Sequence, residues 1–505
     1  MKTKLFLVVA AVALAFTAGA THSPTVAAPQ RQTTIVSSTA DSGPGTLREA
    51  LEQATAGTTI IFNPTLFPPE DPATIFILTA LPELAQGRVT IDASDAGVIL
   101  DGSQAPRTQP VPGFMVTSTG NVIRGLQILH FSSGGIILER GARDNIVGGD
   151  RTKGAGPTGQ GNVISGNEVG VGINGVGTRA NVVSGNYIGI DVSGSSAMPN
   201  IRGVVITGAT DNILGGTNEG QGNVISGNEM DGVVIAGSDT TGNRVIGNHI
   251  GISASGAQPI GNGAAGVWLG EGTQQNTIGG SNSGERNVIS GNGNNGVAID
   301  GGAYNTVSGN YIGTDSSGTA PIPNGNFGVA IGGSAQGNQI GGPTAAEGNV
   351  ISGNGGGGVE CLGSGVRDNT IRGNLIGLDV HGNQALPNFY GVLIHLGAVH
   401  NTVQGNVVSG NNEGVTIAGS GTMSNTVSGN FIGTNVAGDA AIGNEIDGVW
   451  IGEGAEYNIV GGGTPEERNI ISGNLNNGVV IDASAHNVIS GNYVGTDVTG
   501  SEPLG

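Results

Sequence analysis

The sequence predicts an all-β fold, a right-handed parallel β-helix (solenoid) of three-strand coils with a short N-terminal capping helix. Three observations carry this prediction: the composition, an internal repeat of about 62 residues, and short Val/Ile runs bounded by Gly and Asn. The 505 residues include 97 Gly, and only 11% of the chain is charged. This composition suits short strands joined by tight corners and excludes a coiled coil. Gly does not recur at every third position, which excludes a collagen-like helix.

The repeat is clearest in the string Asn-Val-Ile-Ser-Gly-Asn and its variants. These strings recur at intervals of 57 to 64 residues and begin at Asn162, Asn223, Asn287, Asn349, Asn406 and Asn469. Strings of the type NTVSGNYIGTD alternate with them and begin at Asn181, Asn243, Asn305, Asn369, Asn425 and Asn487. A third element, Gly-Val-x-apolar, returns about every 31 residues from Gly135 to Gly478. Three strand-like runs in each 31 residues predict one coil, and about twelve coils after residue 134.

The corners of each coil carry Asn beside Gly. Gly takes positive φ readily, and Asn is the next most tolerant residue. An inward Asn repeated in every coil can hydrogen-bond to the Asn of the coils above and below. We therefore expect Asn ladders with a structural role. Parallel connections between twisted strands are right-handed, which gives the solenoid its hand.

The N-terminal residues predict export. Lys2 and Lys4 precede an apolar run, and Ala18-Gly19-Ala20 fits a cleavage site. The run is shorter than the roughly 20 residues that a membrane span needs. We expect a signal peptide at 1–20, a linker at 21–34, an N-terminal cap with irregular first coils at 35–134, and a regular parallel β-helix at 135–505. The protein is predicted to be secreted, extracellular or in the cell envelope, without a membrane span.

The two ends of the predicted solenoid differ. Thr46 and Glu49 fit a capping box for a helix over 46–56, with an apolar face made by Leu47, Ala50, Leu51 and Ala54. This helix is expected to cover the first coil. No such element follows the last coil at 478–497. Because open strand edges invite pairing, the sequence predicts end-to-end self-association or a frayed last coil.

The Asn/Gly/Ile strings resemble the right-handed parallel β-helix repeat family, the pectin-lyase-like fold. The IGTD repeats, together with DSGPGTLREAL near the start, are similar to large bacterial secreted proteins of that family. The resemblance covers residues 33–505. It implies the fold but not one activity, because the family includes lyases, hydrolases, epimerases and adhesins.

The charge balance excludes several partners. The net charge is −20, with 18 Lys and Arg against 38 Asp and Glu. This surface repels nucleic acid and anionic membranes, and also polyuronates unless a cation bridges them. Cys361 is the only cysteine, so no internal disulfide can form, and its place in Gly-Val-Glu-Cys predicts a core side chain.

The outward position of the Gly-Val-x-apolar strands is unusually apolar and includes both tryptophans. Trp268 with Glu271, and Trp450 with Glu453, are predicted to bind a polysaccharide or cell-surface glycan by stacking and hydrogen bonding. The alternative is that each Trp packs under a loop. A second row consists of Tyr187, His249, Tyr311, Leu375, Phe431 and Tyr493. Its Tyr187, Tyr311 and Tyr493 are further candidate ligand-binding residues, unless each ring covers the loop of its own repeat.

Acidic turns follow these aromatic positions. Asp191, Asp315, Asp379 and Asp497 occupy one place in the repeat, and Ser253 and Asn435 occupy the same place elsewhere. A D-x-x-G turn can bind Ca²⁺ through its oxygen atoms. Ser and Asn cap a turn about as well as Asp but bind Ca²⁺ poorly, so the substitutions favour an Asx-turn. We expect no cofactor or metal, with Ca²⁺ as the alternative.

Acid and base residues concentrate at 358–400. Glu360 and His395 are expected to point outward on adjacent coils, where a carboxylate and an imidazole can act as acid and base. Arg372, Asp368, His381, Tyr390 and His400 lie in the same two coils. The sequence favours a secreted scaffold or adhesion-type surface protein that binds glycans. The alternative is a polysaccharide lyase, hydrolase or epimerase, so whether the protein is an enzyme stays open.

Overall fold

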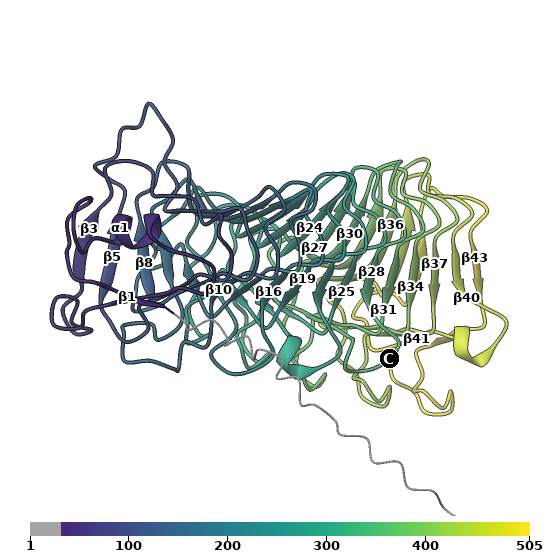
Figure 1. The fold of residues 1–505 in the computed structure, drawn as a ribbon. Coiled ribbons are helices and arrows are strands. Elements are labelled where there is room, and N and C mark those ends of the chain that lie inside the picture. The colour runs from purple at the N-terminus through teal and green to yellow at the C-terminus, as the bar shows by residue number, and fades with distance from the viewer. Residues whose placement is uncertain (1–31) are drawn as a thin grey trace, which may run out of the picture.

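The computed structural model describes residues 32–505, and these form a parallel β-helix with three long sheets (Figure 1). Sheets A, B and C contain 16, 15 and 13 strands, and every strand pair within them is parallel. The predicted all-β, right-handed, pectin-lyase-like solenoid is confirmed. The predicted signal peptide at 1–20 lies outside the described residues. β1 begins at Thr33, two residues inside the predicted linker, because it pairs with β2.

The strand bounds show one short strand per coil in each sheet. Sheet A consists of β1 (Thr33–Val36), β2 (Thr59–Phe62), β4 (Thr90–Asp92), β7 (Val122–Arg124), β10 (Ile146–Gly148), β13 (Val182–Ser184), β16 (Ile213–Gly215), β19 (Arg244–Ile246), β22 (Thr277–Gly279), β25 (Thr306–Ser308), β28 (Gln339–Gly341), β31 (Thr370–Arg372), β34 (Thr402–Gln404), β37 (Thr426–Ser428), β40 (Ile459–Gly461) and β43 (Val488–Ser490). Sheet B consists of β3 (Ala73–Phe76), β5 (Val98–Asp101), β8 (Leu126–Leu129), β11 (Val163–Ser165), β14 (Tyr187–Ile188), β17 (Val224–Ile225), β20 (His249–Ile250), β23 (Val288–Ile289), β26 (Tyr311–Ile312), β29 (Val350–Ile351), β32 (Leu375–Ile376), β35 (Val407–Val408), β38 (Phe431–Ile432), β41 (Ile470–Ile471) and β44 (Tyr493–Val494).

Sheet C carries the candidate site described below. It consists of β6 (Phe114–Val116), β9 (Gly134–Leu138), β12 (Val169–Asn174), β15 (Arg202–Thr207), β18 (Val233–Ala236), β21 (Val267–Leu269), β24 (Val297–Asp300), β27 (Phe327–Gly332), β30 (Gly357–Leu362), β33 (Tyr390–His395), β36 (Glu413–Ala418), β39 (Val449–Gly452) and β42 (Val479–Ile481). From β9 to β42 there are twelve strands, as the repeat predicted. Two 3₁₀ turns, η1 (Ser283–Glu285) and η2 (Pro465–Glu467), lie in the loops.

The core is a column of stacked aliphatic side chains. In β15, for example, Val204 and Ile206 point inward and are fully buried, whereas Val205 between them faces outward. Since each strand pairs in register with the next, Val and Ile stack on Val and Ile along the rod. Branched aliphatic side chains suit this pleated, fully buried surface.

Three Asn ladders run along the corners, as predicted. The ladder before sheet A runs from Asn121 to Asn487, the ladder before sheet B from Asn162 to Asn492, and the ladder before sheet C from Asn167 to Asn474. In each, Nδ2 of one Asn donates to Oδ1 of the Asn one coil later, over 2.8–3.3 Å. These amides are therefore committed to structure.

The N-terminal end is covered by helix α1 (Leu47–Glu52). Thr46 Oγ1 accepts from the Glu49 amide over 3.2 Å, and Glu49 Oε2 accepts from the Gly45 amide over 2.6 Å. The predicted apolar face is buried in the core. The helix is shorter than the predicted 46–56, because Thr55 and Thr58 form a turn in which the Thr58 amide donates to the Thr55 carbonyl.

At the far end, the last coil exposes side chains of the kind that are buried in every earlier coil. Ile481, Ile489 and Val494 are 46%, 36% and 51% exposed, and they belong to β42, β43 and β44. Figure 1 shows these strands at the yellow end of the rod, opposite α1. Self-association through this apolar surface stays a prediction.

Candidate functional site: the outward face of sheet C

The outward residues of sheet C form a straight row. Strand register places Val205, Val234, Trp268, Ala298, Ala330, Glu360, Leu393, Thr416, Trp450 and Val480 at equivalent positions on successive coils. This is the stack predicted from the sequence. The row is straight because each coil adds one strand in register, so the spacing along it is the strand spacing of about 4.8 Å.

Three hollows follow one another along this row. They have volumes of about 420, 390 and 410 Å³. The first extends from Val169 to Trp268, the second from Asp231 to Leu362, and the third from Tyr390 to Glu453. We call the surface that they form the sheet C groove. It runs from β12 to β39, nine strand spacings or roughly 43 Å.

Both tryptophans line the groove and are half-buried. Each indole lies over the glycine two residues later in the chain, since a Cβ at Gly270 or Gly452 would overlap the ring. The rings are thus held flat against the sheet by their own strands. They are six strand spacings apart, roughly 29 Å. Their role in binding stays a prediction.

The acidic partners predicted for the tryptophans are placed differently. Glu453 lines the third hollow together with Trp450. Glu271 is exposed in the turn after β21 and does not line any of the three hollows. The two GEG turns follow equivalent strands, but the third hollow includes its turn and the second does not.

Glu360 and His395 meet in the groove, with Glu360 on the strand midway between those of the two tryptophans. Glu360 pairs with Leu393 across the strands, and His395 lies two residues further along β33. Their side chains bridge this offset, with His395 Nε2 3.0 Å from Glu360 Oε1. The His395 side chain is 22% exposed and the Glu360 side chain is 12% exposed, so the pair is accessible but largely enclosed. A carboxylate and an imidazole in this arrangement can exchange a proton with a bound molecule.

The groove is acidic. Its lining contains the carboxylates of Asp231, Asp300, Glu360, Glu413, Asp447 and Glu453. Arg202 is the one Arg or Lys among the residues that line the three hollows. Burial raises the pKa of Tyr390, and the negative charges of Glu413 and Glu453 raise it further. The third hollow therefore has a negative potential that disfavours anions.

Several of these carboxylates are fixed by neighbouring groups. Asp447 Oδ1 accepts from the backbone and side-chain amides of Asn477, at 3.1 and 2.8 Å. Glu413 Oε2 accepts from Thr416 Oγ1 over 2.7 Å. Such contacts hold the wall of the groove in one arrangement before any ligand arrives, which lowers the entropy cost of binding.

Sequence reasoning missed most of this wall. Asp231, Asp300, Glu413 and Asp447 lie beside the row rather than in it, so the Gly-Val-x-apolar pattern did not single them out. Tyr390 was noted only as a neighbour of Glu360, and it does line the third hollow. Arg372, by contrast, lies in β31 of sheet A and belongs to a different face of the solenoid.

The aromatic row lies on sheet B, away from the groove. The guanidinium carbons of Arg151, Arg286 and Arg468 lie 5.2, 4.2 and 4.1 Å from the ring centroids of Tyr187, Tyr311 and Tyr493, respectively. Each ring also contacts a glycine in the loop of its own repeat, such as Gly318 against Tyr311. These contacts favour the interpretation that the rings cover their own loops. Their ligand-binding role stays a prediction.

In the acidic turns the carboxylate accepts from amides four and five residues later, not two residues later as in the expected Asx-turn. Asp315 Oδ1 accepts from the amides of Thr319 and Ala320 at 3.0 and 3.2 Å, and Asp191, Asp379 and Asp497 accept from the amides at the equivalent positions. Burial raises the pKa of Asp315, but hydrogen bonds from Ser317 and these amides outweigh that effect and lower it. Among residues 32–505, no group of three or more His, Cys, Asp or Glu side chains is placed to hold a metal ion.

Two further features concern reactivity and membranes. Cys361 is fully buried in the core, as predicted, and burial raises its pKa to about 12, with Glu360 contributing. Its thiol is therefore unreactive at neutral pH.

Within 32–505 the longest helix is α1, far too short to cross a membrane.

Comparison with known proteins gives similarity at the level of the fold. A scan against protein-family models finds no match, and a search of curated proteins finds none either. Among solved structures, the Dettilon tailspike protein (gp208) shares 16% identity with a TM-score of 0.38, covering 86% of this chain. The present chain spans 62% of that tailspike.

Two other similar solved structures are named as enzymes. The AlgE4 A-module, a mannuronan C-5 epimerase of Azotobacter vinelandii, shares 14% identity (TM-score 0.30; 89% of this chain and 91% of that chain). Pectate lyase Pel9A shares 14% identity (TM-score 0.29; 76% and 80%).

Proposed function

We propose that this protein is a secreted β-helix scaffold that binds a polysaccharide lengthwise along the sheet C groove. The observation that carries the proposal is the straight row of outward residues, with two half-buried tryptophans six strand spacings apart and three hollows along it. A groove of roughly 43 Å with a regular strand repeat suits an extended polymer better than a compact ligand. Indole faces stack on the C–H faces of sugar rings, and the acidic walls accept hydrogen bonds from hydroxyl groups.

The charge of the groove selects the class of polysaccharide. Six carboxylates face one guanidinium across the three hollows. A polyuronate brings one negative charge per sugar, and each would lie against these carboxylates without a cation to pair with. Neutral polymers avoid this repulsion, and the positively charged groups of amino-sugar polymers are attracted by the carboxylates. The proposed ligand is therefore a neutral or cationic polysaccharide.

The chain offers a direct assay, because Trp268 and Trp450 are its only tryptophans and both line the groove. Fluorescence titration with soluble chitosan, a neutral β-glucan and polygalacturonate should change the emission with at least one of the first two and not with the third. Trp268→Ala and Trp450→Ala should each weaken binding about tenfold, since a buried aromatic contact is worth about 1.5 kcal/mol.

A matched control is Tyr304→Ala, which removes an aromatic side chain that is 57% exposed outside the groove. Affinity electrophoresis should show no effect of this change. Equal weakening by Tyr304→Ala, or preferential binding of polygalacturonate, would contradict the proposal.

The Glu360–His395 pair favours a second candidate function, a polysaccharide-active enzyme. The two side chains are 3.0 Å apart and lie between the strands of the two tryptophans, where a bound chain would pass. In a groove that disfavours polyuronates, hydrolysis fits better than elimination or epimerisation, since those reactions act beside a uronate carboxylate. Glu360→Gln should then abolish release of reducing ends while leaving tryptophan quenching intact. Undiminished release would remove this pair from consideration.

A further inference from the structure

The Asn ladder before sheet C begins with a break in the repeat. Leu129 pairs with Ser165, so His130 lies level with Gly166, and Phe131 takes the place of Asn167 in the coil before it. Gly166 has a φ of 75°, and His130 holds a similar φ of 63°. A left-handed conformation costs a residue with a Cβ roughly 1 kcal/mol. This corner therefore retains a strained histidine where the next coil uses glycine.

Phe131 anchors a long loop at this corner. Its ring is buried and lies between Gly102 and Gly113, the two ends of the connection from β5 to β6. A Cβ at Gly102 would overlap the ring, and one at Gly113 would lie 3.1 Å from it. Only glycine allows both ends of the loop to approach so closely. The loop over 102–113 thus forms a wall at this corner.

The histidine side chain is held in place by an aspartate. His130 Nδ1 lies 3.2 Å from Asp101 Oδ2, while Asp101 Oδ1 accepts from the Ser103 amide over 2.7 Å. The His130 side chain remains 45% exposed. Asp101 therefore orients the ring at the surface, with the second ring nitrogen unconstrained by this contact.

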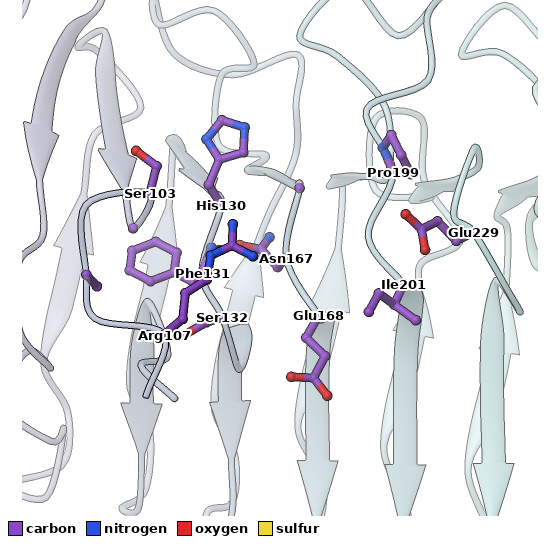
Figure 2. A pocket seen from close by; sticks show the side chains of 13 residues that line it. Ser103, Arg107, His130, Phe131, Ser132, Asn167, Glu168, Pro199, Ile201 and Glu229 are labelled. Carbon is purple, nitrogen blue, oxygen red and sulfur yellow. The ribbon is translucent and has the colours of Figure 1, made fainter. Parts of the chain in front are cut away.

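A cleft of about 360 Å³ opens between the loop and the following corners. Figure 2 shows Arg107 and His130 on one side of it and Glu168, Ile201 and Glu229 on the other. Glu168 and Glu229 follow ladder Asn residues two coils apart, roughly 9.6 Å. The cleft adjoins the sheet C groove, because Glu168 and Ile201 are followed directly by Val169 and Arg202 of the first hollow.

We propose that this cleft binds the end of an uncharged saccharide chain. Its volume suits a small ligand, and its lining offers donors at Arg107 and His130 and acceptors at Glu168 and Glu229. Hydroxyl groups can pair with both the donors and the acceptors. A ligand carboxylate would be repelled by the two glutamates, and a ligand ammonium group would be repelled by Arg107. Ile201 and the neighbouring Pro199 provide a small apolar surface for the C–H face of a sugar. The loop over 102–113 closes one side, which favours a terminal sugar over a passing chain.

This inference rests on the proposed polysaccharide function and is tested separately from it. Calorimetric titration of the full chain uses cellotetraose, mannotetraose, N-acetylated chitotetraose and, as the acidic comparison, tetragalacturonate. At least one of the three neutral oligosaccharides should bind, and the acidic one should not. Glu168→Gln should weaken that binding about tenfold or more, because a hydrogen bond to a charged group is being lost.

His130→Gly is the second variant, and it keeps the test independent of folding. Glycine is the residue that Gly166 provides one coil later, so this variant should fold at least as well as the parent. It should nevertheless bind the neutral oligosaccharide about tenfold more weakly. Glu219→Gln, which changes an exposed carboxylate outside the cleft and the groove, should have no effect.

Failure of all three neutral oligosaccharides to bind would overturn the inference, as would equal binding by the parent, Glu168→Gln and His130→Gly. If Trp268-dependent binding of a polymer persists in that case, only chain-end recognition fails. If oligosaccharides bind in the cleft while Trp268→Ala leaves polymer binding unchanged, only the groove proposal fails.

Discussion

The Asn ladders should carry much of the local stability of each coil, and Asn310 tests this. Its Oδ1 accepts from the backbone amide and from Nδ2 of Asn287, at 3.2 and 2.9 Å, in a fully buried corner. Asn310→Ala leaves both donors without this acceptor. Since each buried unsatisfied donor costs about 1–3 kcal/mol, the two donors should lower the local stability of the coil by roughly 2–6 kcal/mol.

Hydrogen exchange measured by mass spectrometry is the appropriate assay, because coils in a solenoid open locally rather than all at once. Amides of β22 to β26 should exchange about thirtyfold faster or more, which corresponds to the lower bound of 2 kcal/mol. Asn294→Ala in the same coil is the matched control, since Asn294 is exposed. Its effect should stay within about 0.5 kcal/mol. If the two variants accelerate exchange equally, the ladder does not stabilise the coil in the way argued here.

Three further predictions concern the groove, pH and the open end. Gly270→Ala should displace the Trp268 ring, shift its fluorescence emission and weaken polysaccharide binding. Gly332→Ala should have none of these effects, because Gly332 occupies the equivalent position two coils later and has open space around it. Identical behaviour of the two variants would contradict the assigned position of the Trp268 ring. Burial raises the pKa of Asp92, but hydrogen bonds from Arg124 and Ser94 outweigh burial, and the pKa is lowered. The ionised Asp92 carboxylate therefore stabilises the folded state fully above the ordinary pKa of 3.8, and this stabilisation is lost as the pH falls below that value. The melting temperature should therefore fall less steeply below about pH 4 in Asp92→Asn than in the parent, and parallel curves would exclude this contribution. Light scattering should show mass rising with protein concentration, and Ile481→Lys with Val494→Lys should abolish the rise; a constant mass for the parent would show that the exposed end does not associate.

The fold was predictable because one short pattern is repeated many times. A Val/Ile run followed by Gly-Asn specifies the same local structure in every coil, so a weak signal at any one strand becomes strong over twelve copies. The strand register follows from the same pattern, and it placed Trp268, Glu360 and Trp450 in one row correctly. The end of α1 was misplaced, since the turn at Thr55 depends on local hydrogen bonds between Thr55 and Thr58 rather than on a repeat.

The sites depended on departures from the repeat, and there the sequence was less informative. It identified Glu360 and His395 as neighbours, because both lie on repeat strands whose register is fixed. It did not identify the cleft at His130, although the replacement of Gly-Asn by His-Phe was a visible signal. Only the tertiary structure showed that Phe131 anchors the loop over 102–113 and that this loop faces Glu168 and Glu229. The physical reason is that a solenoid fixes distances between equivalent residues through strand spacing, whereas the path of an irregular loop is decided by packing contacts that have no period in the sequence.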